Sequence, residues 1–282
     1  MNTILTGLLL ACAVSSAQAQ VLNSPESVEF HPRSGRALVS NTSGGNVLWR
    51  APDGTLSVFT DAPSAPYGIE FLRGVVYVLD SGFLRGYDVD TAASVLNLAI
   101  TNATFLNGIT SDGVNTLYIT DFSAKRLLKV DVSDLANPVQ TPLQTLTPTP
   151  NGVVYDKANN RLLIATWGTG RVLSYDIAAN TAPTTLINVT GYSNIDGIAL
   201  DCNGFIHIAA WTCAGGGGCL RRFEPPFSLT STPIVEGPAL SNPADIDFGT
   251  RSGEIGIPEA GANRVSFVQA CAAPLFADDF ER

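Results

Sequence analysis

Pro150-Asn151-Gly152-Val153 decides the fold, because five further copies of this short pattern recur along the chain. In most copies a polar or aromatic residue comes second, a small residue third, and Ile or Val opens a strand in fourth place. The other copies are Pro25-Glu26-Ser27-Val28, Pro66-Tyr67-Gly68-Ile69, Leu106-Asn107-Gly108-Ile109, Ile195-Asp196-Gly197-Ile198 and Pro243-Ala244-Asp245-Ile246. The third positions of the copies are 27, 68, 108, 152, 197 and 245. A period of about 40–50 residues, filled with short strands, is typical of a β-propeller with one blade per repeat.

The first repeat shows what each blade contains. Alternating apolar residues bounded by Gly, Asn, Asp and Pro predict strands at Ser27–Phe30, Arg36–Ser40, Asn46–Arg50 and Leu56–Thr60. We therefore predict an all-β, six-bladed β-propeller over residues 20–272, with four antiparallel strands per blade. The sixth repeat has three such segments before the tail at residues 273–282. Its outer strand must come from Pro274–Phe280 or from residues 20–24; the C-terminal segment is favoured because residues 20–24 are few.

Residues 1–19 resemble a secretory signal peptide, with an apolar core at Ile4–Val14 and a small-x-small cleavage site at Ala17-Gln18-Ala19. No other segment approaches the 18 or so apolar residues of a membrane span. The formal net charge of −9 argues against nucleic acid or an anionic membrane as partner. We expect an exported protein, periplasmic or extracellular, acting as a monomer on a small molecule. The acidic and aromatic tail at residues 275–281 hints at a bacterial source.

The cysteines fit an oxidising compartment. Removing the signal removes Cys12 and leaves Cys202, Cys213, Cys219 and Cys271, an even number. A zinc site is disfavoured because the spacings lack paired C-x2-C motifs. The predicted topology places Cys213 and Cys219 on either side of one turn, and Cys202 and Cys271 at the opposite face of the propeller. We predict the disulfides Cys213–Cys219 and Cys202–Cys271.

Equivalent residues of a propeller lie on a ring around its axis. The second positions of the pattern form such a ring, which we call the axial ring: Glu26, Tyr67, Asn107, Asn151, Asp196 and Ala244. Two carboxylates held close together repel each other, and a divalent cation resolves that conflict. Carboxylate and amide oxygens are the ligands that Ca2+ prefers. The sequence thus predicts one divalent cation, expected to be Ca2+, bound by Glu26, Asn107, Asn151 and Asp196.

In a propeller, the turn after each second strand lies at the same end of the central channel as the start of the inner strand, and therefore at the same end as the axial ring. This places Asp121, Trp167 and Trp211 around the opening, and with Tyr67 they are the predicted substrate-pocket residues. For the two tryptophans, packing between blades is an equally open interpretation. By contrast, Asp112, Asp156 and Asp201 fall in turns at the other face, where Asp mainly satisfies turn backbone.

At the axial ring the chain resembles the six-bladed gluconolactonase/regucalcin (senescence marker protein) family, together with paraoxonases and diisopropylfluorophosphatase. In that superfamily a Glu of blade 1, an Asn of blade 4 and an Asp of blade 5 bind the catalytic divalent cation, and some members add an Asn of blade 3. The resemblance, which spans about residues 24–270, implies these roles for Glu26, Asn151, Asp196 and Asn107. It departs from the family at blade 1, where the Pro and Trp of the family motif are missing. It departs again at Tyr67, where paraoxonases have His.

Two functions remain open on this evidence. One is an exported metal-dependent hydrolase of a lactone, ester or phosphoester, with Asp196 as catalytic general base or nucleophile. The other is a non-enzymatic extracellular binding propeller, since NHL-repeat propellers also carry Pro-x-Gly-Ile before Tyr-Val-x-Asp. Fold alone does not choose between them.

Overall fold

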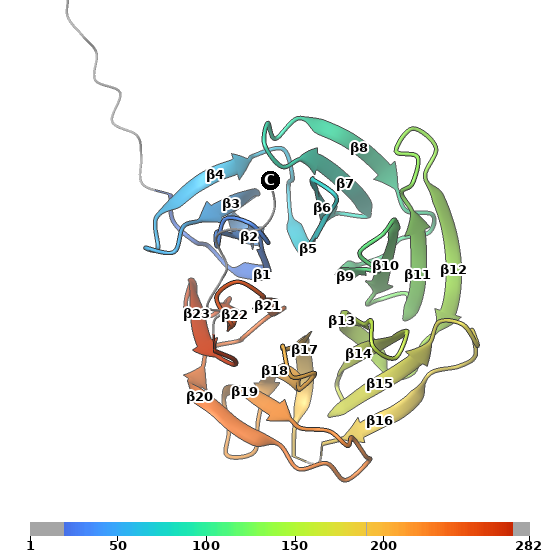
Figure 1. The fold of residues 1–282 in the computed structure, drawn as a ribbon, viewed down its shortest axis with the longest axis vertical. Helices are drawn as coiled ribbons and strands as arrows, with labels where there is room; N and C mark the ends of the chain where they lie inside the picture. Colours follow the sequence, from blue (N-terminus) through green and yellow to red (C-terminus); the bar gives the residue numbers. More distant parts are fainter. Residues whose placement is uncertain (1–19, 190, 273–282) are drawn as a thin grey trace, which may run out of the picture.

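The computed structural model describes residues 20–189 and 191–272, which form six antiparallel sheets arranged around a common axis (Figure 1). Five sheets have four strands that run in sequence order from the axis outwards, and the sixth has three. Apart from the single 3-10 turn η1 (Thr42–Gly44), the described chain contains no helix. The all-β, six-bladed prediction is confirmed. The predicted signal at residues 1–19 and the expected outer strand at residues 274–280 lie outside the described residues.

The strands fall into four concentric sets. The innermost strands are β1 (Pro25–Phe30), β5 (Pro66–Leu72), β9 (Leu106–Ser111), β13 (Thr149–Asp156), β17 (Ser193–Leu200) and β21 (Asp247–Gly249). The second strands are β2 (Ala37–Asn41), β6 (Val75–Asp80), β10 (Thr116–Asp121), β14 (Arg161–Trp167), β18 (Ile206–Thr212) and β22 (Glu254–Glu259). The third strands are β3 (Asn46–Arg50), β7 (Phe83–Asp88), β11 (Arg126–Asp131), β15 (Arg171–Asp176), β19 (Gly218–Phe223) and β23 (Arg264–Gln269). The outer strands are β4 (Leu56–Thr60), β8 (Ser94–Ala99), β12 (Val139–Thr145), β16 (Thr184–Asn188) and β20 (Ile234–Leu240).

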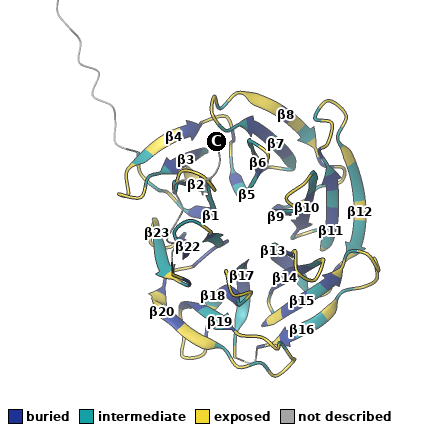
Figure 2. Cartoon of the chain, viewed as in Figure 1, coloured by how far each residue is buried: buried dark blue, intermediate teal, exposed yellow. Residues whose placement is uncertain are grey.

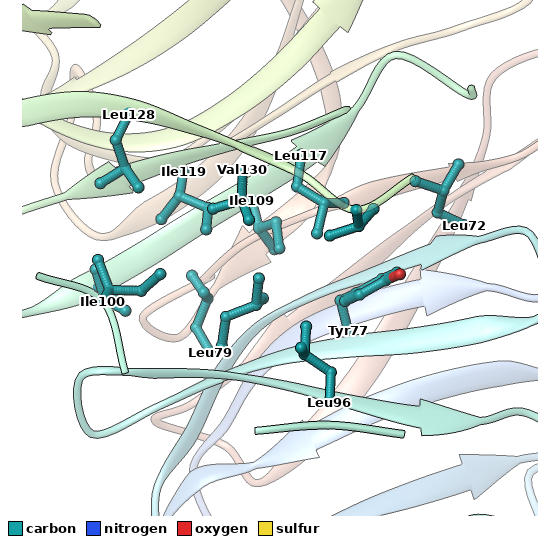
Figure 3. Close-up of a cluster of buried hydrophobic side chains, with 13 residues drawn as sticks. Leu72, Tyr77, Leu79, Leu96, Ile100, Ile109, Leu117, Ile119, Leu128 and Val130 are labelled. Carbon is teal, nitrogen blue, oxygen red and sulfur yellow. The ribbon is translucent and has the colours of Figure 1, made fainter. Parts of the chain in front are cut away.

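The hydrophobic core lies between neighbouring blades. In the cluster of Figure 3, Leu79 of β6 packs with Ile109 of β9 and with Ile119 of β10, which joins blade 2 to blade 3. Leu79 and Ile119 are completely buried. Figure 2 shows the same trend across the molecule, with buried residues on the inner and middle strands and exposed residues concentrated on the outer ones. Each blade therefore depends on its neighbours for burial of its apolar faces, as expected of a repeat architecture.

The circle closes between blades 6 and 1. The backbone N–H of Asp245 donates to the carbonyl of Glu26 at 2.8 Å, and the N–H of Phe30 donates to the Asp247 carboxylate at 2.9 Å. These two bonds join the last inner segment to β1 and so complete the ring of blades.

Both predicted disulfides are present. Cys202–Cys271 ties the turn before β18 of blade 5 to the segment that follows β23 in blade 6, and Cys213–Cys219 spans the turn between β18 and β19. Within the described part of the chain, no helix is long and apolar enough to cross a membrane.

Candidate functional site

A β-bulge sits at the axial ring in each of the first five inner strands. In blade 4, Pro150 pairs with Thr166 and Val153 with Ile164, so three steps along β13 face only two along β14. The registers of β1, β5, β9 and β17 with their partners shift at the same place. A bulge leaves its extra residue outside the ladder and redirects the side chain. The repeated pattern therefore turns one side chain per blade towards the axis.

The glycine that follows the ring residue is required by the close approach of the next blade. A Cβ atom on Gly152 would lie 2.5 Å from the carbonyl oxygen of Asp196, and one on Gly108 would lie 2.6 Å from that of Asn151. Gly68 and Gly197 face the carbonyls of Asn107 and Ala244 in the same way. Each glycine thus lets the backbone of one ring residue touch the inner strand of the preceding blade, where a side chain would not fit.

Hydroxyl groups on the second strands form hydrogen bonds with the backbone of the axial-ring segments. In blade 3 the Thr120 hydroxyl donates to the carbonyl of Asn151 at 2.6 Å and accepts from the N–H of Gly108 at 2.9 Å. In blade 1 the N–H of Ser27 donates to the Ser40 hydroxyl at 2.7 Å. The Thr120 and Ser40 side chains are fully buried, so the ring residues stand on a rigid support.

The structure brings the four predicted oxygen ligands together. Glu26, Asn107, Asn151 and Asp196 line one cavity of about 260 Å3 at the mouth of the axial channel. Tyr67, Trp167 and Trp211 of the predicted pocket also line it. Six further residues complete the wall: Ser24, Thr42, Phe105, Phe122, Ala244 and Ala260. Direct contact links blades 1 and 3 across the axis, where Asn107 Nδ2 lies 3.4 Å from Glu26 Oε1.

One oxygen atom of each of the four residues is buried without a hydrogen-bond partner. These atoms are Glu26 Oε2, Asn107 Oδ1, Asn151 Oδ1 and Asp196 Oδ1. Leaving a buried polar atom unpaired costs about 1–3 kcal/mol, and more for a charged one. Within residues 20–189 and 191–272, no cluster of three or more His, Cys, Asp and Glu side chains could hold a metal ion. A metal site at the axial ring would therefore need the amide oxygens of Asn107 and Asn151 in addition to the carboxylates of Glu26 and Asp196.

The two ring carboxylates are electrostatically strained. Burial raises the pKa of Asp196 to about 7, although the Trp211 indole and the Asn151 amide favour the charged form. Burial also raises the pKa of Glu26 well above its usual range, and the charges of Asp196 and Asp245 add to the effect. Burial and the Glu26 charge raise the pKa of Tyr67, which keeps its hydroxyl protonated. A positive charge placed among these groups would stabilise both carboxylates in their ionised form.

Asp121 does not line the cavity, contrary to the prediction. Its carboxylate is fully buried within blade 3, where it accepts from the Thr104 hydroxyl at 2.6 Å and from the Phe105 N–H at 2.9 Å, and pairs with Arg126 at 3.2 Å. The same device recurs at Asp80–Arg85 and Glu259–Arg264, with the same spacing in sequence. Asp121 therefore anchors the segment that leads into the inner strand of its own blade.

The prediction for Asp121 was wrong because the repeats were aligned one position out of register in blade 3. Asp121 pairs with Leu106, whereas Thr166 pairs with Pro150 and Ala210 with Ile195. The residue equivalent to Trp167 and Trp211 is thus Phe122, which does line the cavity. Successive side chains of a strand point to opposite faces, so a slip of one position exchanges a pocket residue for a core residue.

Further carboxylates, missed from the sequence, lie at the opposite mouth of the channel. Glu29, Glu70, Asp245 and Asp247 line a second cavity there. Glu29 accepts from the N–H of Phe71 at 3.1 Å, so Glu29 and Asp247 both bond the inner strand of a neighbouring blade. Glu29, Glu70 and Asp247 each come three residues after an axial-ring residue, and Asp245 directly follows one, a spacing that the repeat alignment could have indicated.

Comparison with known proteins supports the fold. No protein-family model matches the chain, and no curated protein is similar to it in sequence. A gluconolactonase from Xanthomonas campestris is similar in structure, with a TM-score of 0.70 and 14% identity over 89% of this chain and 87% of that one. A virginiamycin B lyase from Staphylococcus aureus has a TM-score of 0.61 and 11% identity, over 90% of this chain and 88% of that one. A chain of a nidogen/laminin complex has a TM-score of 0.63 and 12% identity, over 86% of this chain and 94% of that one. The chain is therefore a six-bladed β-propeller whose structural neighbours include a gluconolactonase, a virginiamycin B lyase and a chain of a nidogen/laminin complex.

Proposed function

We propose that this protein is an exported, metal-dependent hydrolase that acts on a lactone, ester or phosphoester at the axial ring. The observation that carries the proposal is the set of four buried oxygen atoms without partners, one from each of four blades, around a single cavity. Export is supported by the two disulfides, which persist in oxidising compartments. The gluconolactonase and lyase neighbours are enzymes with a similar fold, and at 14% and 11% identity they support the fold alone.

The donor set fits a hard divalent cation such as Ca2+. Glu26, Asn107, Asn151 and Asp196 would hold it, because Ca2+ takes carboxylate and amide oxygens and tolerates irregular geometry. The two ring carboxylates would balance its charge. When bound, such an ion would polarise a carbonyl or phosphoryl oxygen and lower the pKa of a coordinated water.

The chain's own groups divide the remaining work. Asp196 lines the cavity, so a carboxylate oxygen that the ion does not hold can accept a proton from an attacking water or act as the nucleophile. The Tyr67 hydroxyl stays protonated and can donate to a leaving oxygen. The indoles of Trp167 and Trp211 contact each other at 5.2 Å between ring centroids and screen the site from bulk water.

The experiment uses the protein from residue 20 onwards. Calcium affinity is measured by calorimetry, and hydrolysis of lactones, aryl esters and phosphotriesters is measured with and without chelator. Asp196→Asn keeps an oxygen ligand but removes the base, so it should abolish turnover and weaken Ca2+ only partly. Glu26→Gln should mainly weaken Ca2+. Asp53→Asn, an exposed carboxylate in a turn, is the matched control for loss of one charge and should change neither.

Each outcome decides the proposal. Chelator-sensitive turnover that one divalent ion restores supports it. No Ca2+ binding, or equal affinity in the parent and in Glu26→Gln, would overturn the metal site. Metal binding without turnover on any substrate of the panel would favour the alternative, a non-enzymatic NHL-like binding propeller in which the ion serves structure or ligand binding.

A further inference from the structure

One side of the cavity is a continuous aromatic wall, which we call the aromatic arc. Its members are Tyr67, Phe105, Phe122, Trp167 and Trp211. Successive rings meet edge to face, with centroids 4.8, 5.5, 5.9 and 5.2 Å apart. The rings come from four consecutive blades, 2 to 5. All five side chains are only partly buried, so the arc faces the cavity and does not serve solely as packing between blades.

Apart from Glu26, the described residues that line the other side of the cavity have small side chains. Ser24 and Thr42 of blade 1, and Ala244 and Ala260 of blade 6, line this sector. The Thr42 hydroxyl is already engaged, since it donates to the carbonyl of Pro66 at 2.5 Å. A bound molecule therefore meets flat apolar surface on one side and open space on the other.

The cavity lacks groups that would recognise an anion. None of the described residues that line it is Lys, Arg or His. A divalent ion at the axial ring would be balanced by Glu26 and Asp196, which leaves no fixed positive charge for a carboxylate or phosphate group. Apart from the ring carboxylates and amides, the polar side-chain groups of the wall are the hydroxyls of Ser24, Thr42 and Tyr67 and the two indole N–H groups. Sugar hydroxyls turned towards the phenyl rings of Phe105 and Phe122 would find no hydrogen-bond partner there, which is unfavourable.

We infer that the substrate class is uncharged and carries an aromatic or similarly flat apolar ring that stacks on the aromatic arc. The same observations argue against sugar lactones and anionic esters. That the molecule is a substrate with a reacting carbonyl or phosphoryl group rests on the proposed function. That it is uncharged and carries a flat apolar ring is inferred from the residues that line the cavity.

Binding of unreactive ring molecules tests this inference independently of catalysis. Chroman and 1,5-anhydroglucitol each contain a six-membered cyclic ether, the first fused to benzene and the second saturated and polyhydroxylated. Neither can be hydrolysed. Two of the three tryptophans, Trp167 and Trp211, lie in the arc, and Trp49 lies in the core between blades 1 and 2. Tryptophan emission therefore reports occupancy, and titrations are run with Ca2+ and with chelator.

We expect chroman to bind at least tenfold more tightly than anhydroglucitol, as measured by the change in tryptophan emission, both with Ca2+ and with chelator. Trp167→Ala should weaken chroman binding about tenfold, whereas Trp167→Phe, which keeps an aromatic ring, should restore most of it. Circular dichroism checks that both variants fold. Trp49→Phe serves as the control that removes the reporter outside the cavity and should leave the affinity unchanged.

Failure of this inference and failure of the proposed function are distinguishable. Chroman binding without hydrolysis of any lactone or ester refutes the enzyme but supports the substrate class. Hydrolysis of glucono-δ-lactone, with anhydroglucitol bound as tightly as chroman, refutes the substrate class and leaves the enzyme intact. Equal chroman affinity in Trp167→Ala and the parent would also overturn the role of the arc.

Discussion

Gly152→Ala tests whether the repeated glycine positions the axial ring. The added Cβ would lie 2.5 Å from the Asp196 carbonyl oxygen, 3.0 Å from Asp245 Oδ1 and 3.2 Å from the Cα of Gly197. Restoring a van der Waals distance of about 3.5 Å requires the inner strands of blades 4 and 5 to separate by roughly 1 Å. Two of the three neighbours are backbone atoms of a bonded strand, so they cannot rotate away. Overpacking of this kind costs about 1–3 kcal/mol.

The same displacement should reach the proposed metal site. Asn151 and Asp196 stand on the two strands that must separate, and Ca2+–oxygen distances span only about 2.3–2.6 Å. We therefore expect Gly152→Ala to lose about 2 kcal/mol of unfolding free energy and at least tenfold in Ca2+ affinity. Urea unfolding and calorimetry measure the two effects.

Gly113→Ala is the matched control. Gly113 lies in the exposed turn between β9 and β10 with φ +75, and a Cβ there would meet nothing within 4 Å. Alanine in this left-handed conformation costs about 1–2 kcal/mol through backbone strain alone, so stability should fall similarly while Ca2+ affinity stays unchanged. A Gly152→Ala variant within about 0.5 kcal/mol of the parent would refute the close-approach reasoning. Equal loss of Ca2+ affinity in both variants would refute the link to the ring.

Three further predictions follow from the described contacts. The double variant Cys202→Ala/Cys271→Ala opens a loop with sequence separation 69 and should lose on the order of 4 kcal/mol, against about 2 kcal/mol for Cys213→Ala/Cys219→Ala with separation 6; urea unfolding that reverses this order would contradict the loop-entropy account. Asp121→Asn removes the charge that bonds Arg126 and should cost about 2 kcal/mol in the same assay without changing Ca2+ affinity, and a loss of affinity would return Asp121 to the pocket. Burial raises the pKa of Glu70 from 4.5 to about 8 and that of Asp247 to about 6, so the unfolded chain loses these protons at lower pH than the folded chain does. The free energy of unfolding, measured in chelator, should therefore fall as pH rises from 4.5 to 8, and Glu70→Gln should make that fall smaller. A rise in the free energy of unfolding over this range would contradict the prediction.

The prediction of the fold depended on spacing. Six copies of one short pattern, separated by roughly 40–50 residues each, cannot be accommodated by a single sheet, whereas a propeller places each copy in an equivalent position. The same equivalence predicted that Glu26, Asn107, Asn151 and Asp196 would share one site, although they belong to four different blades. The disulfides followed because topology assigns each cysteine to one of two faces.

The positions around the second strands were less predictable. Asp121 and Phe122 are neighbours, and both are compatible with the end of a strand at the ring mouth. Which of them faces the cavity depends on pairing register, and the bulge in β9 shifts that register by one position. Neither the bulge nor its partner is visible in the composition of the segment.

Local pattern by itself determined the number of blades, the axial ring and the residue types available at it, because strand periodicity and repeat length are properties of sequence. Tertiary structure alone decided that Glu26 approaches Asn107 across the axis, that four oxygen atoms are left buried without partners, and that five aromatic rings from four blades join into one wall. These features arise between blades. They depend on distances between atoms that the chain brings together only when the circle closes, so no single repeat contains the information.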